Sequence, residues 1–518
     1  MKISRIIVAA AFAATMFSCT KENLLETQKV HLTFNVANEP SASKAVLNGS
    51  AVEFQASDRI GVWDGTSMNC FETTAGGAHA SFSGTAASAA TYILVSPFSA
   101  NCSVNGSVVT YSIPDIQVAT PGSADPAALV SMAKVSGTSG QAVLYNCVGL
   151  VKVEVPDGLT VKEIHVGGGV GSTVGICGSF TFNTNDQTVN YVDAGSMRTS
   201  ITLVPQAGQS VIAPGTYYIA VRPWTYGGLT LAYVNADNQL CKRTTTNSVE
   251  VARNHIRPVG TLNTANFNAV TGSAVLRYYD QSDNNQFTAL IKTLANGSTT
   301  TATTTDNVIK KIVFRAHTLP YKTNGTNIHN GPLSSVPIRA WVDGDTAYIY
   351  TEAPVITLHS TSGNLFRDFA ALEEVSFNDV NTLAGASFEY MFRNCTKLKS
   401  VDFGNADFSK VTNFSYMFYT GASVLEYVDL GETATTAATT MQSMFNNNQY
   451  LKYLNLGPNF TLAATHTNMF LDAARQTSIA AQGDNDKKCQ LYASQAFYTD
   501  VRANETTFNA ARFNFHAQ

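Results

Sequence analysis

A repeated pattern of apolar residues occupies the last third of the chain. A Leu-x-x-Val-x-Phe motif recurs with similar apolar residues at steps of 26, 27 and 26 residues, starting at Leu372, Leu398, Leu425 and Leu451. A second apolar motif follows each copy, the first being Phe388, Met391 and Phe392. Alternation predicts a short strand, and the i, i+3, i+4 spacing predicts a helical turn. Because neither element can bury its apolar face alone, the repeats should stack as a solenoid.

Short alternating segments dominate the chain from residue 29 to about residue 263. Between Val30 and Val36 every second residue is apolar, which predicts a strand with one buried face. No helical periodicity interrupts this region, so the pattern favours β-sandwiches over alternating strands and helices. The further predicted strands, separated by Gly, Pro, Asn or Asp, are Arg59–Trp63, Thr91–Val95, Gly149–Val155, Lys162–Val166, Ser179–Phe182, Ser200–Val204, Thr216–Val221 and Thr230–Val234.

The segments around the repeats predict a transition and two caps. Ser298 to Thr305 is nearly all threonine and should be a loop. Asn307 to Phe314 should form a strand, and Ile338 to Tyr350 should form a hairpin that turns at Asp343-Gly344. The final unit, after residue 488, should run strand, helix, strand and shield the open end of the solenoid.

We therefore predict a mainly β protein, with two N-terminal β-sandwich domains followed by an α/β leucine-rich-repeat solenoid with caps. A chain of 518 residues is long enough for this number of domains. The predicted divisions are a signal peptide (1–18), a lipidated linker (19–28), the sandwiches (29–140 and 141–263), a transition (264–306), an N-terminal cap (307–364), the repeats (365–475) and a C-terminal cap (476–518).

The first 19 residues predict export and a lipid anchor. Lys2 and Arg5 give a basic start, and an almost unbroken apolar run of about a dozen residues follows. Such a run is too short to span a bilayer and is typical of a signal-peptide core. The run ends in Met-Phe-Ser-Cys, which resembles the lipobox of bacterial lipoproteins, whose cysteine is acylated. We expect an outer-membrane protein that is anchored through Cys19, contacts the membrane only through its lipid, and is exposed to the extracellular side.

Composition adds little chemistry to this picture. Only 14% of the residues are charged and the formal net charge is −4, with no basic stripe, so nucleic acid is not an expected partner. The seven cysteines after Cys19 are scattered and contain no C-x-x-C pair, so neither a disulfide framework nor a zinc site is expected. Most of them should be small buried residues.

The front half carries motifs that resemble those of fimbrillin-like proteins. They are Ser43-Lys44-Ala45, the segment from Val52 to Trp63, and three later segments at residues 146–153, 214–223 and 251–256. The resemblance implies processing between Lys44 and Ala45, where fimbrillins have an Arg-Ala step. Removal of the segment before that step would open a groove for a strand of a neighbouring subunit.

The repeats resemble the BspA-type leucine-rich repeats of bacterial surface lipoproteins. The segments that carry this resemblance are Asn394-Cys395-Thr396-Lys397-Leu398 and the stretch from Asp407 to Asn413. The third repeat departs from the pattern between Gly431 and Thr440, which puts the conformation of its loop in doubt. The resemblance implies a surface-exposed binding domain.

One face of the solenoid is the candidate binding site. Residues that flank the buried position of each strand project outward and should form two rows of neighbours. One row is Glu374, Ser400, Tyr427 and Tyr453, and the other is Ser376, Asp402, Asp429 and Asn455. Three interpretations are open: a carboxylate pair for glycoside hydrolysis, solvated repeat residues, or a ligand-binding face with aromatic anchors.

The sequence shows no catalytic or metal-binding motif, so we expect neither an enzyme nor a cofactor or metal. The predicted function is that of a cell-surface adhesin or protein-binding module acting through the repeats. Its expected partners are a host or bacterial surface protein or glycan. The alternative is an accessory or anchor subunit of a fimbria assembled by strand exchange, with other fimbrial subunits as partners.

Overall fold

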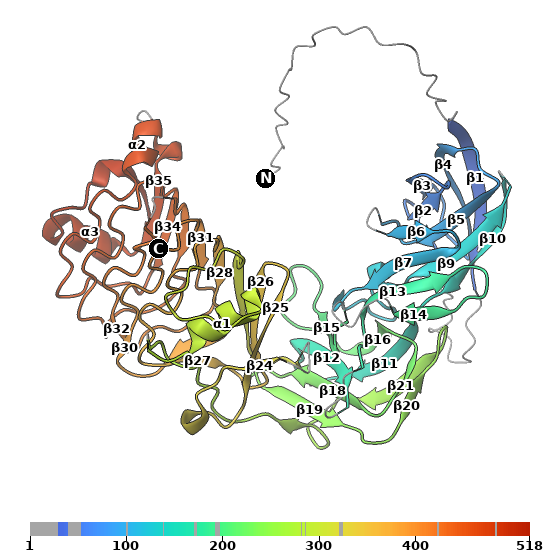
Figure 1. The fold of residues 1–518 in the computed structure, drawn as a ribbon, viewed down its shortest axis with the longest axis horizontal. Coiled ribbons are helices and arrows are strands. Elements are labelled where there is room, and N and C mark those ends of the chain that lie inside the picture. The colour runs from blue at the N-terminus through green and yellow to red at the C-terminus, as the bar shows by residue number, and fades with distance from the viewer. Residues whose placement is uncertain are drawn as a thin grey trace, which may run out of the picture.

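The computed structural model describes residues 29–39, 53–99, 102–137, 139–169, 174–191, 197–280, 282–284, 286–320, 325–421, 424–481 and 484–518. The predicted signal peptide, Cys19, and the step from Lys44 to Ala45 lie outside these residues. Three units follow one another along a curved molecule, with the first strands and the last strands at opposite ends (Figure 1). No helix in the described ranges is both long enough and apolar enough to cross a membrane.

The first unit is a closed barrel of seven strands, which we call the barrel. Its strands are β1 (Lys29–Asn38), β2 (Arg59–Trp63), β3 (Met68–Thr73), β4 (His79–Ala87), β5 (Thr91–Ser96), β9 (Ser131–Ser136) and β10 (Ser139–Asn146). β1 pairs antiparallel with β4 and parallel with β10, and so closes the sheet. The expectation of a sandwich for this unit was wrong, because alternation is the same in both folds and only the long-range β1–β10 pairing closes the barrel.

The second unit, which we call the middle unit, is built from several sheets around one core. A three-stranded sheet (β16–β11–β21) and a six-stranded sheet (β22–β19–β18–β12–β15–β8) both contribute buried residues, among them Val151 and Ile164, as expected of a sandwich. Strands β7 and β8 precede residue 140, yet they pair with β13 and β15, which follow it.

The bounds of the middle unit's elements are as follows: β6 (Ser103–Asn105), β7 (Val108–Ile113), β8 (Ile116–Val118), a 3-10 helix (Pro126–Ala128), β11 (Gly149–Val155), β12 (Glu163–Gly168), β13 (Gly178–Asn183), β14 (Val189–Tyr191), β15 (Ser200–Val204), β16 (Gly215–Val221), β17 (Trp224–Tyr226), β18 (Leu229–Val234), β19 (Leu240–Thr244), β20 (Val249–Val251), β21 (Ile256–Thr261) and β22 (Asn268–Ala269). The strands predicted in this region are all present, with bounds that differ by one or two residues.

The third unit, from Ala274 to the C-terminus, is a stack of coils that we call the coil unit. Its main sheet runs β24 (Thr326–Asn327), β25 (Ile338–Asp343), β26 (Thr346–Thr351), β23 (Lys311–Arg315), β28 (Glu374–Ser376), β31 (Ser400–Asp402), β33 (Tyr427–Asp429), β34 (Tyr453–Gly457), β35 (Cys489–Ala493) and β36 (Phe513–Ala517). From β23 through β28 to β36 the neighbouring strands are parallel. The hairpin predicted at Asp343-Gly344 is confirmed as β25–β26.

The coils contain no helix between residues 365 and 474 of the described chain, so the expected α/β repeat was wrong in its helical part. Tyr390 and Tyr416, at the centre of the second motif, have φ of 53°, which no α-helix contains. The amide groups of this motif instead donate to the next coil, as from Phe388 N to Asn413 O at 2.8 Å. Short parallel ladders run beside it: β27 (Ile356–Leu358) with β29 (Val380–Thr382), and β30 (Ala386–Ser387) with β32 (Val411–Asn413).

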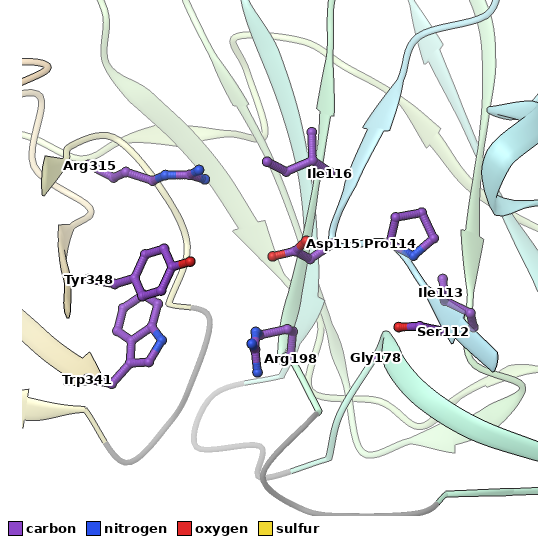
Figure 2. A pocket seen from close by; sticks show the side chains of 10 residues that line it. All are labelled: Ser112, Ile113, Pro114, Asp115, Ile116, Gly178, Arg198, Arg315, Trp341 and Tyr348. Carbon is purple, nitrogen blue, oxygen red and sulfur yellow. The ribbon is translucent and has the colours of Figure 1, made fainter. Parts of the chain in front are cut away.

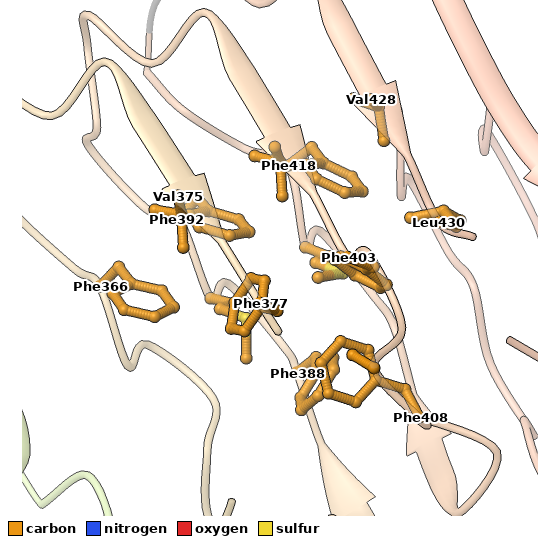
Figure 3. Packing of buried hydrophobic residues seen from close by; sticks show 14 of the residues in the cluster. Phe366, Val375, Phe377, Phe388, Phe392, Phe403, Phe408, Phe418, Val428 and Leu430 are labelled. Carbon is orange, nitrogen blue, oxygen red and sulfur yellow. The ribbon is translucent and has the colours of Figure 1, made fainter. Parts of the chain in front are cut away.

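One continuous apolar core runs through the coil unit, from the first cap through the coils to the last strands. A column of phenylalanines, one in each coil, forms its axis: Phe366, Phe392, Phe418, Phe445 and Phe470. Neighbouring rings in the column are stacked with centroids 5.3–5.7 Å apart, and Figure 3 shows the first three members beside the strands. The two caps and the coils therefore form a single packed body.

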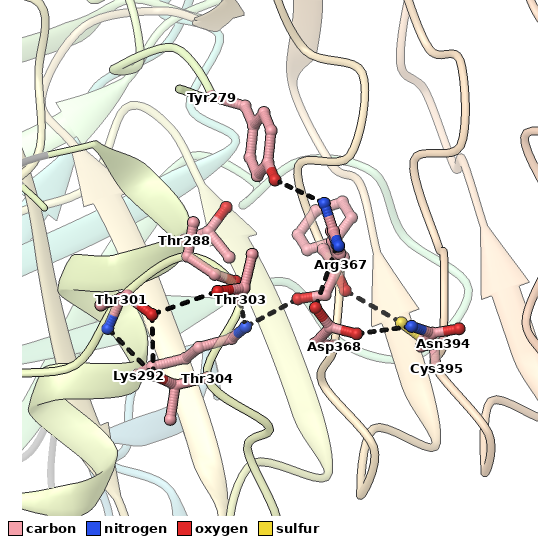
Figure 4. A network of polar contacts seen from close by, with 12 residues as sticks. Tyr279, Thr288, Lys292, Thr301, Thr303, Thr304, Arg367, Asp368, Asn394 and Cys395 are labelled. Carbon is pink, nitrogen blue, oxygen red and sulfur yellow. Dashed lines mark hydrogen bonds and ion pairs between the residues drawn. The ribbon is translucent and has the colours of Figure 1, made fainter. Parts of the chain in front are cut away.

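The transition before the repeats belongs to this core. The sequence interpretation missed helix α1 (Phe287–Asn296), whose Phe287 and Ile291 are fully buried. The threonine-rich segment after α1 is a loop, as predicted, and it is held by Lys292. The Lys292 ammonium donates to the carbonyl oxygens of Ala302 and Arg367, each at 2.7 Å (Figure 4).

Burial lowers the pKa of Lys292 from 10.5 to about 8. In the unfolded chain this ammonium keeps its proton to about pH 10, so the unfolded state binds more protons between about pH 8 and 10. The coil unit should therefore gain about 2 kcal/mol of stability, relative to Lys292→Met, when the pH rises from about 7.5 to 9.5. Urea unfolding of both proteins at the two pH values measures this difference. An equal difference at both values would contradict a lowered pKa.

The C-terminal cap covers the end of the stack. The predicted order of strand, helix and strand is confirmed as β35, α3 (Gln495–Asn504) and β36. A short helix α2 (Arg475–Ala481) precedes them, and 3-10 helices lie at Gly331–Leu333, Asn485–Lys487 and Ala510–Arg512. Phe497 and Val501 of α3 are buried against the last coils, so the helix seals the apolar core.

Candidate binding face

The structure brings the eight predicted face residues together in register. Successive pairs in the first row are Glu374–Ser400, Ser400–Tyr427 and Tyr427–Tyr453, and those in the second row are Ser376–Asp402, Asp402–Asp429 and Asp429–Asn455. The central residue of each strand is buried and the two flanking residues are partly exposed. The two rows therefore lie side by side on the outer face of β28, β31, β33 and β34.

Stacked aromatic rings run along the later half of this face. The rings of Tyr427 and Tyr453 are 4.5 Å apart and nearly parallel, at 7°. Tyr492 of β35 lies 5.2 Å from Tyr453, and His516 of β36 is stacked on Tyr492 at 4.5 Å. The sequence interpretation missed Tyr492 and His516, because the step from Tyr453 to Tyr492 is longer than the repeat.

The stacking determines what the tyrosines can offer a partner. Tyr427 and Tyr453 cover each other's faces, so they present ring edges and hydroxyl groups to solvent. The Tyr427 hydroxyl donates to Asp429 at 3.2 Å. Burial and the charge of Asp429 raise the pKa of Tyr427 and of Tyr453, so both hydroxyls remain proton donors at neutral pH. The stack is therefore a hydrogen-bonding edge more than a flat apolar platform.

The acidic row also has a structural task. Asp402 and Asp429 each accept a hydrogen bond at 2.8 Å from the glycine amide two residues later, and Asn455 accepts one at 3.0 Å. These glycines have positive φ, and a Cβ at Gly457 would lie 2.0 Å from the carbonyl oxygen of Gly431. The turns thus require glycine and hold the row in place.

A cavity of about 430 Å³ lies beside the acidic row. Asp402, Asp429 and Glu432 line it together with Asn455 and Pro458. The Asn455 amide donates to Asp429 at 2.8 Å, so these side chains are partly ordered by one another. Carboxylates and amides at this edge suit a partner that brings hydroxyl, amide or cationic donors.

The remaining predicted residues lie at the margin of this site. Glu374 pairs with Lys311 at 2.7 Å, and the Ser376 hydroxyl accepts a hydrogen bond from Asn378 at 3.2 Å. Both are therefore satisfied by neighbours within the sheet. Among the described residues, no group of three or more His, Cys, Asp or Glu side chains is placed to hold a metal ion.

A second aromatic cluster, which the sequence interpretation missed, lies on a different side of the coils. Tyr390 and Tyr416 are stacked at 4.7 Å and 9°, and Tyr419 stands at right angles to both. The amide of Gln442 donates to the Tyr416 hydroxyl at 3.3 Å. The pair matches Tyr427 and Tyr453 in geometry and is a suitable control for their removal.

Comparison with known proteins gives limited matches. The model of a family described as "Mycoplasma protein of unknown function, DUF285" matches residues 361–481, which lie in the coil unit. No curated protein sequence matches the chain. Because the family model covers less than half of the chain, it describes the coils and not the whole protein.

Solved structures of surface proteins resemble part of the chain. A candidate cell adhesion protein from Bacteroides uniformis is 14% identical, with a TM-score of 0.31, over 46% of this chain and 95% of its own. One from Bacteroides ovatus is 11% identical, with a TM-score of 0.30, over 46% and 96%. The tip fimbrial protein Mfa3 of Porphyromonas gingivalis, with a C-terminal truncation, is 8% identical, with a TM-score of 0.22, over 46% and 99%. All three TM-scores lie below 0.5, so these likenesses assign neither a fold nor a function.

Proposed function

We propose that this chain is a cell-surface binding protein that acts in adhesion through the outer face of its coil unit. The observation that carries the proposal is the ordered row of Tyr427, Tyr453 and Tyr492 beside Asp402 and Asp429. The barrel and the middle unit would hold this face away from the cell. The lipid anchor at Cys19 remains a prediction from the sequence.

The rigidity of the face supports this proposal. Each strand that bears the two rows is fixed from behind by a buried residue of the continuous core, such as Val401, Val428 or Leu454. A partner would meet side chains that are already ordered, so binding would cost little conformational entropy. Tyrosines fixed in this way are frequent sites of high binding energy in interfaces.

We also propose that the coils belong with the leucine-rich-repeat proteins of the BspA type. The parallel ladder, the step of 26 or 27 residues and one phenylalanine per coil support this assignment. The absence of helices from the coils departs from the repeat that the sequence predicted. The partner would then be a host or bacterial surface protein or a glycan with exposed hydrogen-bond donors.

The double variant Tyr427→Ala with Tyr453→Ala should weaken binding by roughly 2 kcal/mol, or about thirtyfold. It removes two ordered hydroxyls and the ring edges between β33 and β34. The measurement is adhesion of the purified protein to the bacterial or host surface from which its partner is captured. The matched control, Tyr390→Ala with Tyr416→Ala, removes an equal stack elsewhere and should bind like wild type. Equal loss in both double variants would exclude a specific role for the face.

A fimbrial subunit is the second candidate, and the position of β1 favours it. The predicted step from Lys44 to Ala45 follows β1, so cleavage there would detach the strand that closes the barrel. β1 supplies the buried side chains Leu32, Phe34 and Val36. Its loss would leave an apolar groove between β4 and β10, which a strand of another subunit could fill.

A further inference from the structure

A separate cavity of about 270 Å³ lies where the middle unit meets the coil unit (Figure 2). Asp115 and Arg198, which precede β8 and β15, form one wall. Arg315 of β23, Trp341 of β25 and Tyr348 of β26 form the other. The cavity is therefore shared by two units, a common position for ligand sites.

The two walls are held together by polar contacts. Arg198 forms an ion pair with Asp343 at the end of β25. The Thr199 hydroxyl donates to the carbonyl oxygen of Pro320 at 2.7 Å, and Lys242 pairs with Glu352 at 2.5 Å. Leu319 of the coil unit is buried against Ala232, Val234 and Leu240 of the middle unit. These contacts fix the width of the cavity.

Polar groups without a protein partner line this cavity. Within the described residues, the Asp115 carboxylate makes no hydrogen bond or ion pair, and the Tyr348 hydroxyl makes no hydrogen bond. Both side chains are only partly exposed. A guanidinium has five donor hydrogens, so Arg198 can bind a ligand while it pairs with Asp343. The cavity thus offers acceptors, donors and a hydroxyl that can serve as either.

The remaining lining decides the chemical class of the ligand. Trp341 and Tyr348 are stacked at 5.0 Å and 10°, and they give the cavity an aromatic side. The positive charges of Arg198 and Arg315 are balanced by the negative charges of Asp115 and Asp343, so an ionic ligand is not favoured. The volume lies below the roughly 300–1,000 Å³ of pockets that take drug-sized molecules. One uncharged ring with several hydroxyl groups fits these conditions.

We propose that this cavity binds a single neutral sugar residue, such as the end of a glycan. The Asp115 carboxylate would accept hydrogen bonds from two sugar hydroxyls, and Arg315 would donate to ring or hydroxyl oxygens. The Tyr348 hydroxyl would complete the set, and the aromatic side would contact the C–H face of the ring. The site is independent of the coil face that carries the proposed function.

The test is titration of the complete described chain with methyl glycosides of galactose, glucose, mannose and N-acetylglucosamine, followed by saturation-transfer NMR and calorimetry. At least one should bind, and Asp115→Ala should weaken it about tenfold or more. Tyr348→Phe removes only the hydroxyl and should weaken it several-fold without altering the melting temperature. Asp237→Ala, at an exposed turn of the middle unit, is the control and should bind like wild type.

Three results would overturn the proposal. The first is that none of these glycosides binds. The second is that binding is the same in Asp115→Ala, Tyr348→Phe and wild type. The third is preferential binding of glucuronate or inorganic phosphate, because this would make the cavity an anion site. Loss of adhesion in the Tyr427 and Tyr453 variant with intact sugar binding would separate the two sites.

Discussion

Replacing Phe377 with alanine should lower the free energy of unfolding of the coil unit by about 3–5 kcal/mol. The side chain is fully buried where the first cap meets the coils. Its ring is stacked on Phe314 at 5.3 Å, and its edge contacts include Phe403 at 5.4 Å and Phe408 at 5.5 Å. Several rings around one position cannot collapse together into the space left by alanine, so the cavity cost should be near its upper range.

Fluorescence of Trp341 can follow this unit alone in a Trp63→Phe, Trp224→Phe background. Urea unfolding in that background compares Phe377→Ala with wild type and with Tyr450→Ala. Tyr450 is 47% exposed and should lower the free energy of unfolding by less than about 1 kcal/mol. A similarly small change for Phe377→Ala would mean that the cap and the coils do not share one core.

Periodicity predicted the strands of the coil unit and the rows of its face. Each Leu-x-x-Val-x-Phe motif fixes which residues of a strand face inward, and a constant step places equivalent residues on neighbouring strands. Tyr427 and Tyr453 are neighbours for this reason. The same logic failed at Tyr492, because the last strands do not follow the step of the repeat.

The helical part of the repeat failed for a different physical reason. Apolar residues at i, i+3 and i+4 predict a helical face only when the backbone can bond within the segment. Here Tyr390 and Tyr416 have positive φ, and the amide groups bond to the next coil. The stack therefore satisfies the backbone between coils, an option that no single segment of the sequence reveals.

Contacts between distant segments account for the rest of the differences. The barrel depends on a parallel pairing of β1 with β10, more than one hundred residues later in the chain. The cavity between the units joins Asp115, Arg198 and Tyr348, which share no motif or period. Such sites follow from how finished units dock, so sequence pattern alone did not indicate them.

A chain that begins at Ala45 should lose the cooperative unfolding of the barrel, because it lacks β1. Leu32, Phe34 and Val36 leave the core, and each buried apolar side chain of this kind contributes about 1.5–3 kcal/mol. The backbone pairs of β1 with β4 and β10 are lost as well. Differential scanning calorimetry of the truncated and the longer chain measures this loss.

A synthetic peptide of residues 29–39 should restore the barrel by binding in the vacated groove. Glu39 at its end would re-form two hydrogen bonds with Arg253 of the middle unit, at 2.6 and 3.1 Å, which fix the register of the strand. Fluorescence anisotropy of the labelled peptide measures its affinity, and a peptide with Phe34→Ala should bind at least tenfold more weakly. The chain that retains β1 is the control and should not bind the peptide. An unchanged melting temperature after truncation, or equal peptide binding by both chains, would argue against a fimbrial role based on strand exchange.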